Sequence, residues 1–197
     1  GSVAKFPPVA ATLERMLTRR LAASSAPQFH GALRAAVGNG KGPRVAKLRP
    51  SYVALFDTVA SRLDDFPPEL ADDLALWGFC AASHGQLVKP ERPLTAESAA
   101  RPLAQMVDVL QRLVVEKATP RPAGPIGGSL RSLVLGQLYE ALAQLNHPSG
   151  GLCKHDWARR DVQQALGLAA QIGGACWSRE QRTAIERWGS TLRARGV

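Results

Sequence analysis

Acidic side chains are almost missing from the first quarter of this 197-residue chain. Glu14 is the single acid among the first 49 residues, which hold nine lysines and arginines. The whole chain has 25 basic and 16 acidic residues, so residues 50–197 carry 16 and 15 and are close to neutral. So many positive side chains in one region repel one another within the fold, and binding of an anionic partner relieves that repulsion. The first 49 residues are therefore the first place to look for a binding surface.

Cysteines, aromatic residues and long apolar runs are also scarce. Three cysteines, Cys80, Cys153 and Cys176, cannot all pair within the chain, which favours a reducing intracellular compartment over a disulfide framework. No apolar run approaches the roughly 20 residues of a membrane-spanning helix. A hydrophobic content of 45% with 21% charged residues is typical of a globular protein. The pair Gly1-Ser2, without an initiating Met, indicates a cloning scar.

Where the hydrophobic pattern has a clear period, that period is close to 3.6 residues, and no segment alternates as a strand would. We predict an all-α fold, either an irregular helical bundle or a short helical-repeat solenoid of roughly eight helices. The predicted helices centre on residues 9–21, 29–37, 52–63, 70–84, 103–114, 130–145, 162–172 and 184–192.

Several details of these helices can be predicted from single residues. The first helix is expected to face the core with one apolar stripe, made of Val9, Leu13, Met16, Leu17 and Leu21. Pro102 is expected in a first turn, where its missing N–H costs nothing. Asp156 is a candidate N-cap, and Ser178 with Gln181 has the spacing of a capping box. The tryptophans are expected as core anchors: Trp77, Trp157, Trp177 and Trp188.

The proline- and glycine-rich stretch 119–128 is a candidate boundary between two lobes. The prediction is a basic N-terminal lobe over 3–118 and a C-terminal lobe over 129–197. A single domain is the alternative, because 197 residues can bury one continuous core.

The basic residues of the N-terminal region form the main candidate site. Arg15 and Arg19 are four residues apart on one predicted helix face, and a glycine-containing loop follows. Flexible cations and free backbone N–H groups suit phosphate oxygens. A solvated surface neutralised by the acids of 57–73 is one alternative, and an acidic protein or membrane is another. The candidate polyanion-binding residues are Arg15, Arg19, Arg34, Lys41, Arg44, Lys47 and Arg49.

The segment Cys153-Lys154-His155-Asp156 brings a thiol, an imidazole and a carboxylate together in the sequence. Cys153 and His155 are the candidate catalytic residues, because nearby cations make a thiol more nucleophilic. The alternative is a structural loop in which Asp156 caps the next helix. No spacing matches a standard zinc site, so we predict neither a metal nor a cofactor. His30 and His84 are interpreted as histidines of the core or of helix ends.

Two segments resemble a known group of helical-repeat proteins. FPPELADDLALWGFCAASHG (66–85) resembles the repeat helix of octotricopeptide-type proteins and of the SKWP-repeat effectors of plant-pathogenic bacteria. SLRSLVLGQLYEALAQL (129–145) resembles the leucine-rich helix of the same group. The resemblance implies stacked helical hairpins and a binding role, either to RNA or within a host cell.

Together these patterns predict a helical binding module without catalysis, whose basic N-terminal surface engages a polyanion, with RNA favoured. The alternative is a domain of a secreted bacterial (type III) effector that binds or modifies a host protein, in ubiquitin signalling for example. In that case the partner is an acidic host protein and the compartment is the host cell.

Overall fold

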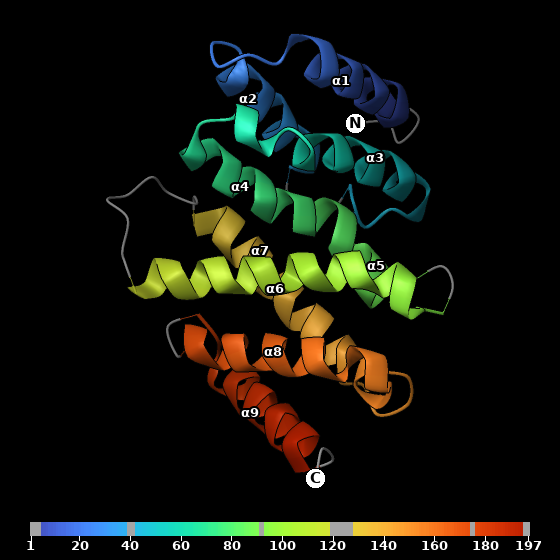
Figure 1. The fold of residues 1–197 in the computed structure, drawn as a ribbon, viewed down its shortest axis with the longest axis vertical. Helices are drawn as coiled ribbons and strands as arrows, with labels where there is room; N and C mark the ends of the chain where they lie inside the picture. Colours follow the sequence, from blue (N-terminus) through green and yellow to red (C-terminus); the bar gives the residue numbers. More distant parts are fainter. Residues whose placement is uncertain (1–4, 39–41, 91–92, 119–127, 174–175, 195–197) are drawn as a thin grey trace. The chain divides into compact units, whose positions relative to one another are not determined.

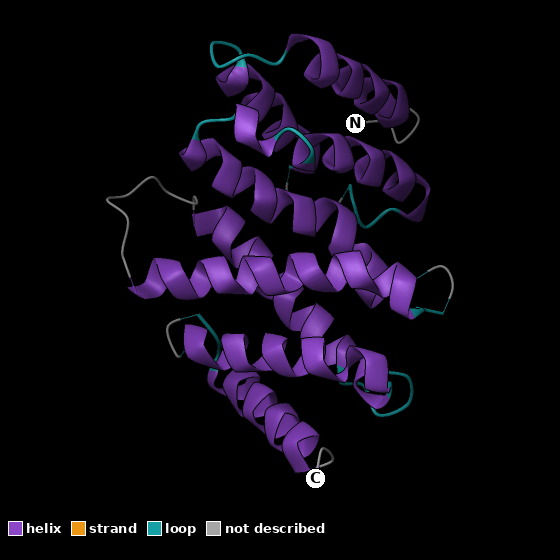
Figure 2. Cartoon of the chain, viewed as in Figure 1, coloured by secondary structure: helices purple, strands orange, loops and turns teal. Residues whose placement is uncertain are grey.

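The described residues form helices joined by loops, which confirms the all-α prediction. The structure is a computed structural model that describes residues 5–38, 42–90, 93–118, 128–173 and 176–194. Within these residues there is no strand, and Figure 2 shows helices joined by short loops. The chain divides into two compact units, residues 1–85 and 86–197. The predicted boundary at 119–128 lies, apart from Gly128, outside the described residues.

The first unit holds α1 (Phe6–Arg20), α2 (Ala26–Val37), α3 (Arg49–Ala60) and α4 (Pro68–Gly78), with short 3₁₀ turns at Ala46–Leu48 and Leu63–Asp65. A buried π-helical turn, Phe79–Ser83, continues α4 into α5 (His84–Val88). This continuous rod has no polar face over its second half, which agrees with its apolar sequence. Counted as one rod, it brings the helices of the described residues to the predicted number of roughly eight.

Alternate helices of the first unit pack together, α1 on α3 and α2 on α4 (Figure 1). The ring of Phe6 stacks on that of Tyr52 at 4.1 Å, which joins the N-terminal ends of α1 and α3. At the other end of the pair, the guanidinium of Arg62 donates to the carbonyl oxygens of Leu17 and Thr18, at 3.1 and 3.0 Å. Helices α1 and α3 therefore run parallel, and Arg62 satisfies carbonyls that a helix end leaves without partners.

The second unit holds α6 (Ala96–Ala118), α7 (Gly128–Leu145), α8 (Asp156–Ile172) and α9 (Arg179–Ala194), plus a 3₁₀ turn at Leu152–Lys154. Helix α8 packs on both α6 and α9. Near the start of α7, Arg131 lies 3.5 Å from the sulfur of Cys176, just before α9. Further along, the rings of Tyr139 and Trp188 lie 5.8 Å apart. These two contacts place α7 and α9 parallel.

Two helices of the second unit begin at reciprocal hydrogen bonds. Ser178 and Gln181 exchange bonds between side chain and backbone N–H at 2.9 and 3.2 Å, which confirms the predicted capping box. Thr95 and Ser98 exchange similar bonds before α6. Because this second pair starts α6 at Ala96, Pro102 lies inside the helix, and its prediction in a first turn is wrong.

Three further predictions about single residues are corrected by the structure. Asp156 is the first helical residue of α8, with His155 as the N-cap, and its carboxylate pairs instead with Arg159 at 2.6 Å. Trp157 is 38% exposed, and its ring faces that of His155 at 5.6 Å. Val9 and Met16 are 52% and 40% exposed, because α1 buries the face that carries Ala10 and Leu17.

Candidate polyanion-binding surface

Helix α1 carries three arginines in contact with solvent. Arg15, Arg19 and Arg20 are exposed. Arg15 and Arg19 lie on the side of α1 turned away from buried Ala10 and Leu17, whereas Arg20, three residues after Leu17, lies beside the buried face at the end of the helix. The guanidinium of Arg15 donates to the Thr12 hydroxyl at 3.4 Å. Among the described residues, no carboxylate forms an ion pair with any of the three. We call this set the α1 arginine surface.

The single acid of α1 does not neutralise this surface. The Glu14 side chain is half-buried, and the charged group that acts on its carboxyl is Asp57 of α3. Burial first, and then the negative charge of Asp57, raise the pKa of the Glu14 carboxyl above its ordinary value. Glu14 therefore belongs to the α1–α3 contact, and the outward face of α1 keeps its positive charge.

The loop between α2 and α3 places the other basic candidates. The Tyr52 hydroxyl donates to the Ala36 carbonyl oxygen at 2.8 Å, which ties the end of α2 to the start of α3. A side chain at Gly42 would overlap that hydroxyl, so glycine is needed where the loop passes Tyr52. Arg44 and Lys47 follow as exposed residues before α3. Lys41 lies outside the described residues.

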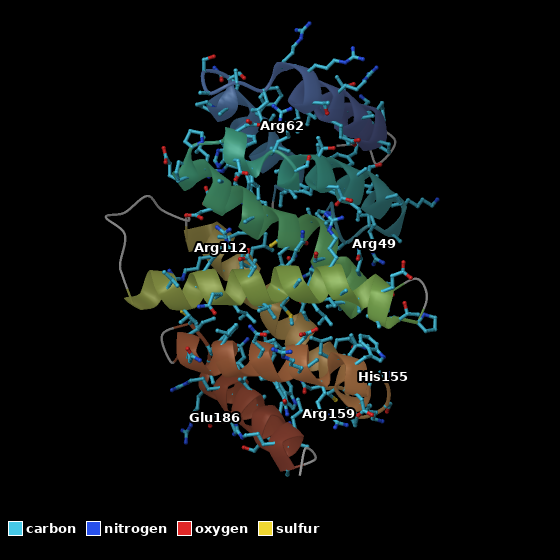
Figure 3. The ribbon with its side chains drawn as sticks, viewed as in Figure 1. Arg49, Arg62, Arg112, His155, Arg159 and Glu186 are labelled. Atoms are coloured by element: carbon cyan, nitrogen blue, oxygen red, sulfur yellow. The ribbon has the colours of Figure 1, made fainter. Side chains whose placement is uncertain are left out.

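Arg49 occupies a different environment from the other candidates. Its side chain is half-buried at the start of α3 (Figure 3). It packs beside Gly85, where an added Cβ would lie 3.2 Å from Nε. Burial raises the pKa of the Cys80 thiol to about 12, and the charge of Arg44 opposes that rise. Arg49 therefore supports the packing around α5, whereas Arg44 keeps an exposed side chain.

Two acids of the stretch 57–73 contact basic side chains of the first unit, and Asp73 does so near His30 and Arg34 of the basic N-terminal region. Asp65 pairs with Arg62, and Oδ2 of Asp73 lies 3.3 Å from Nε2 of His30. Burial raises the pKa of Asp73, while the hydrogen bond and charge of His30 and the charge of Arg34 oppose that rise. Arg34 thus shares the α2–α4 contact with an acid, unlike the arginines of α1.

The basic candidates consequently separate into two groups. Arg15 and Arg19 lie together on α1, with Arg20 as a third member that the sequence prediction omitted. Arg44 and Lys47 lie near the other end of the α1–α3 layer, since Phe6 and Tyr52 join the N-terminal ends. Helix α1 is roughly 22 Å long at about 1.5 Å per residue, so an extended anion is needed to reach both groups.

Cys153 and His155 occupy different environments, and their candidate catalytic role stays a prediction. The Cys153 side chain is buried in the 3₁₀ turn Leu152–Lys154, whereas His155 is exposed and its ring stacks on Trp157 (Figure 3). No hydrogen bond joins the thiol to the imidazole in the described part of the chain. The same part contains no group of three or more His, Cys, Asp or Glu side chains that could hold a metal ion.

No family model matches the chain, and comparison with curated proteins and with solved structures gives no match either. Among the described residues, the structure contains no helix that combines the length and the hydrophobicity needed to cross a membrane. The resemblance of 66–85 and 129–145 to helical-repeat proteins stays a prediction. The α1 arginine surface is therefore the feature of the chain that points to a function.

Proposed function

We propose that the chain is a non-catalytic helical binding module whose α1 arginine surface binds single-stranded RNA through its phosphates. The observation that supports this proposal is the exposure of Arg15, Arg19 and Arg20 without a carboxylate partner among the described residues. Guanidinium groups donate in pairs to phosphate oxygens, which makes arginine well suited to this contact.

The arrangement favours recognition of the backbone over recognition of bases. Arg15 and Arg19 are one helical turn apart, so successive phosphates of an extended strand can meet successive side chains. The nearby aromatic rings of Phe6 and Tyr52 are stacked on each other and buried or half-buried. Because stacking on free aromatic rings is a main source of base contacts in single strands, we expect little sequence preference.

A second function is favoured by the apolar side chains on the same face. Val9 and Met16 are seven residues apart and exposed, so they form an apolar strip beside the arginines. An amphipathic helix with acidic flanks, from an acidic host protein bound by a secreted effector for example, would cover both the strip and the charges. Val9 and Met16 should contribute to the affinity for such a helix, but not to the affinity for RNA.

Substitution of each feature separately distinguishes the two functions. One variant replaces Arg15, Arg19 and Arg20 by Gln, and a second replaces Val9 and Met16 by Ser. The matched control replaces three exposed arginines of the second unit, Arg160, Arg179 and Arg182, by Gln and so loses the same net charge. Fluorescence anisotropy measures binding to a labelled mixed-sequence RNA strand and to a synthetic acidic amphipathic peptide.

For RNA binding, the first variant should weaken binding roughly tenfold or more, while the other two stay close to wild type. Equal weakening by the control would show that only net charge matters and would contradict a defined surface. If the peptide binds instead, and both the arginine and the Val9/Met16 variants weaken it, the protein-binding alternative replaces the RNA proposal.

A further inference from the structure

A pocket of about 150 Å³ lies in the second unit, far in sequence from the α1 arginine surface. It is formed where the loop after α7, the 3₁₀ turn Leu152–Lys154 and α9 meet. An engineered protein cavity of about this volume admits a benzene ring, so the pocket can take one small planar group.

The wall of the pocket that includes α9 is apolar, and a ring contact with α7 holds it in position. Trp188 and Leu192 of α9 contribute, together with Pro148 and the buried thiol of Cys153. The Trp188 ring faces Tyr139 of α7 at 5.8 Å, which fixes the orientation of this wall. An aromatic ring of a ligand would therefore pack against a preformed surface, so its binding would not require this wall to rearrange.

Positive charge lies at the same pocket and has no internal counterpart. Lys154 and Arg187 line it, and both side chains are exposed. Neither forms an ion pair with a described residue, and the lining contains no Asp or Glu. The Asn146 amide nitrogen and the Thr191 hydroxyl already donate, to the carbonyl oxygens of Leu142 and Arg187, at 2.8 and 2.9 Å. The two cations are thus the charged donors of the pocket.

We propose that this pocket binds a small planar organic anion, with its ring against Trp188 and its carboxylate between Lys154 and Arg187. A metal cation is a poor fit, because the lining offers a single thiol and two cations. An inorganic anion would leave the apolar wall in contact with water, so it gains less from the site than an aromatic carboxylate does.

The probe is 4-fluorobenzoate, observed by fluorine NMR line broadening, with neutral 4-fluorobenzamide as its isostere. A ligand of this size should bind with a Kd on the order of 1 mM. The test variant combines Lys154→Gln with Arg187→Gln. The matched control combines Arg179→Gln with Arg182→Gln, which removes the same charge from α9 outside the pocket. Unchanged thermal unfolding of both variants verifies that the fold is intact.

We expect the test variant to bind 4-fluorobenzoate roughly five- to tenfold more weakly than wild type and the control to stay within about twofold. The neutral amide should bind at least about fivefold more weakly than the carboxylate. Equal binding of the two probes, equal weakening by the control, or no broadening at about 10 mM would each overturn the proposal. Displacement by an equal concentration of inorganic phosphate would overturn it too, because the ring would then contribute nothing. None of these outcomes depends on RNA binding by the first unit.

Discussion

The imidazole Nε2 of His30 lies 3.3 Å from the carboxylate Oδ2 of Asp73, across the contact between α2 and α4. The same imidazole lies over the ring of Trp77, with ring centres 4.6 Å apart. One acid of the stretch 57–73 is thus held inside the first unit by a residue of the basic region. The exposed arginines of α1 take no part in this contact.

Replacement of His30 should destabilise the first unit. His30→Ala leaves the mostly buried Asp73 carboxylate without its hydrogen bond and removes the ring packed on Trp77, which should cost about 1–2 kcal/mol in the free energy of unfolding. Urea denaturation measures this cost. His155→Ala, at an exposed ring without a side-chain hydrogen bond, is the control and should change the free energy by less than about 0.5 kcal/mol. Equal effects would show that the His30–Asp73 contact contributes nothing.

Gly42 can be tested against a glycine that has space around it. Gly42→Ala should cost about 1–3 kcal/mol, because the new methyl group overlaps the Tyr52 hydroxyl and disturbs its bond to Ala36. Gly31→Ala, in α2 with no atom within 4 Å of the added Cβ, should stabilise by about 0.5–1 kcal/mol. In a Tyr52→Phe background much of the Gly42→Ala cost should disappear. Additive costs would contradict the assigned clash.

The side chain of Gln137 in α7 is fully buried, and neither its amide oxygen nor its nitrogen has a hydrogen-bond partner among the described residues. Gln137→Met keeps a similar volume and removes two buried polar atoms, so it should raise the free energy of unfolding by about 1–2 kcal/mol. Gln164→Met, on the exposed face of α8, should change it by less than about 0.5 kcal/mol. A loss of stability in Gln137→Met would contradict the assignment of an unsatisfied amide.

The pH dependence of stability should reveal the contact of Glu14 with α3. Its folded-state pKa is raised above 4.5, so folding disfavours the charged form and stability falls as the pH rises through that value. Glu14→Gln should therefore be more stable than wild type at pH 7, by up to about 0.5 kcal/mol, and closely similar at pH 4. Exposed Asp64→Asn is the comparison, measured by thermal unfolding at both pH values. A difference that grows toward low pH would contradict the raised pKa.

Local chemistry accounts for most of what the sequence predicts correctly. Helical periodicity identifies the helices, and the Ser178–Gln181 capping box depends only on residues three apart. The Thr95–Ser98 pair escapes prediction because its second member is a serine in place of the usual Glu or Gln. Because this pair starts α6 at Ala96, the helix begins earlier than its apolar period predicts. Pro102 therefore lies in the interior of α6 instead of its first turn.

The sequence is a poorer guide to which side of a helix is covered by another helix. Val9 and Met16 fit the apolar period of α1, but α3 packs against Ala10 and Leu17, so part of that stripe remains exposed. Trp157 is exposed for a related reason, because it lies at the start of α8 beside His155. The placement of Arg49 beside Gly85 joins residues 36 positions apart and has no local signal. Packing between segments distant in the sequence decides the cases of Val9, Met16 and Arg49.

The salt dependence of RNA binding tests the central claim most directly. The affinity for a labelled single strand is measured at several salt concentrations for wild type, for the variant with Arg15, Arg19 and Arg20 replaced by Gln, and for the Arg160/Arg179/Arg182 control. Each lost phosphate contact should reduce the slope of log K against log salt by about 0.7, so the α1 variant should lose roughly 2 units of slope. The control should keep the wild-type slope. Equal slopes for wild type and the α1 variant would contradict an RNA-binding surface on α1.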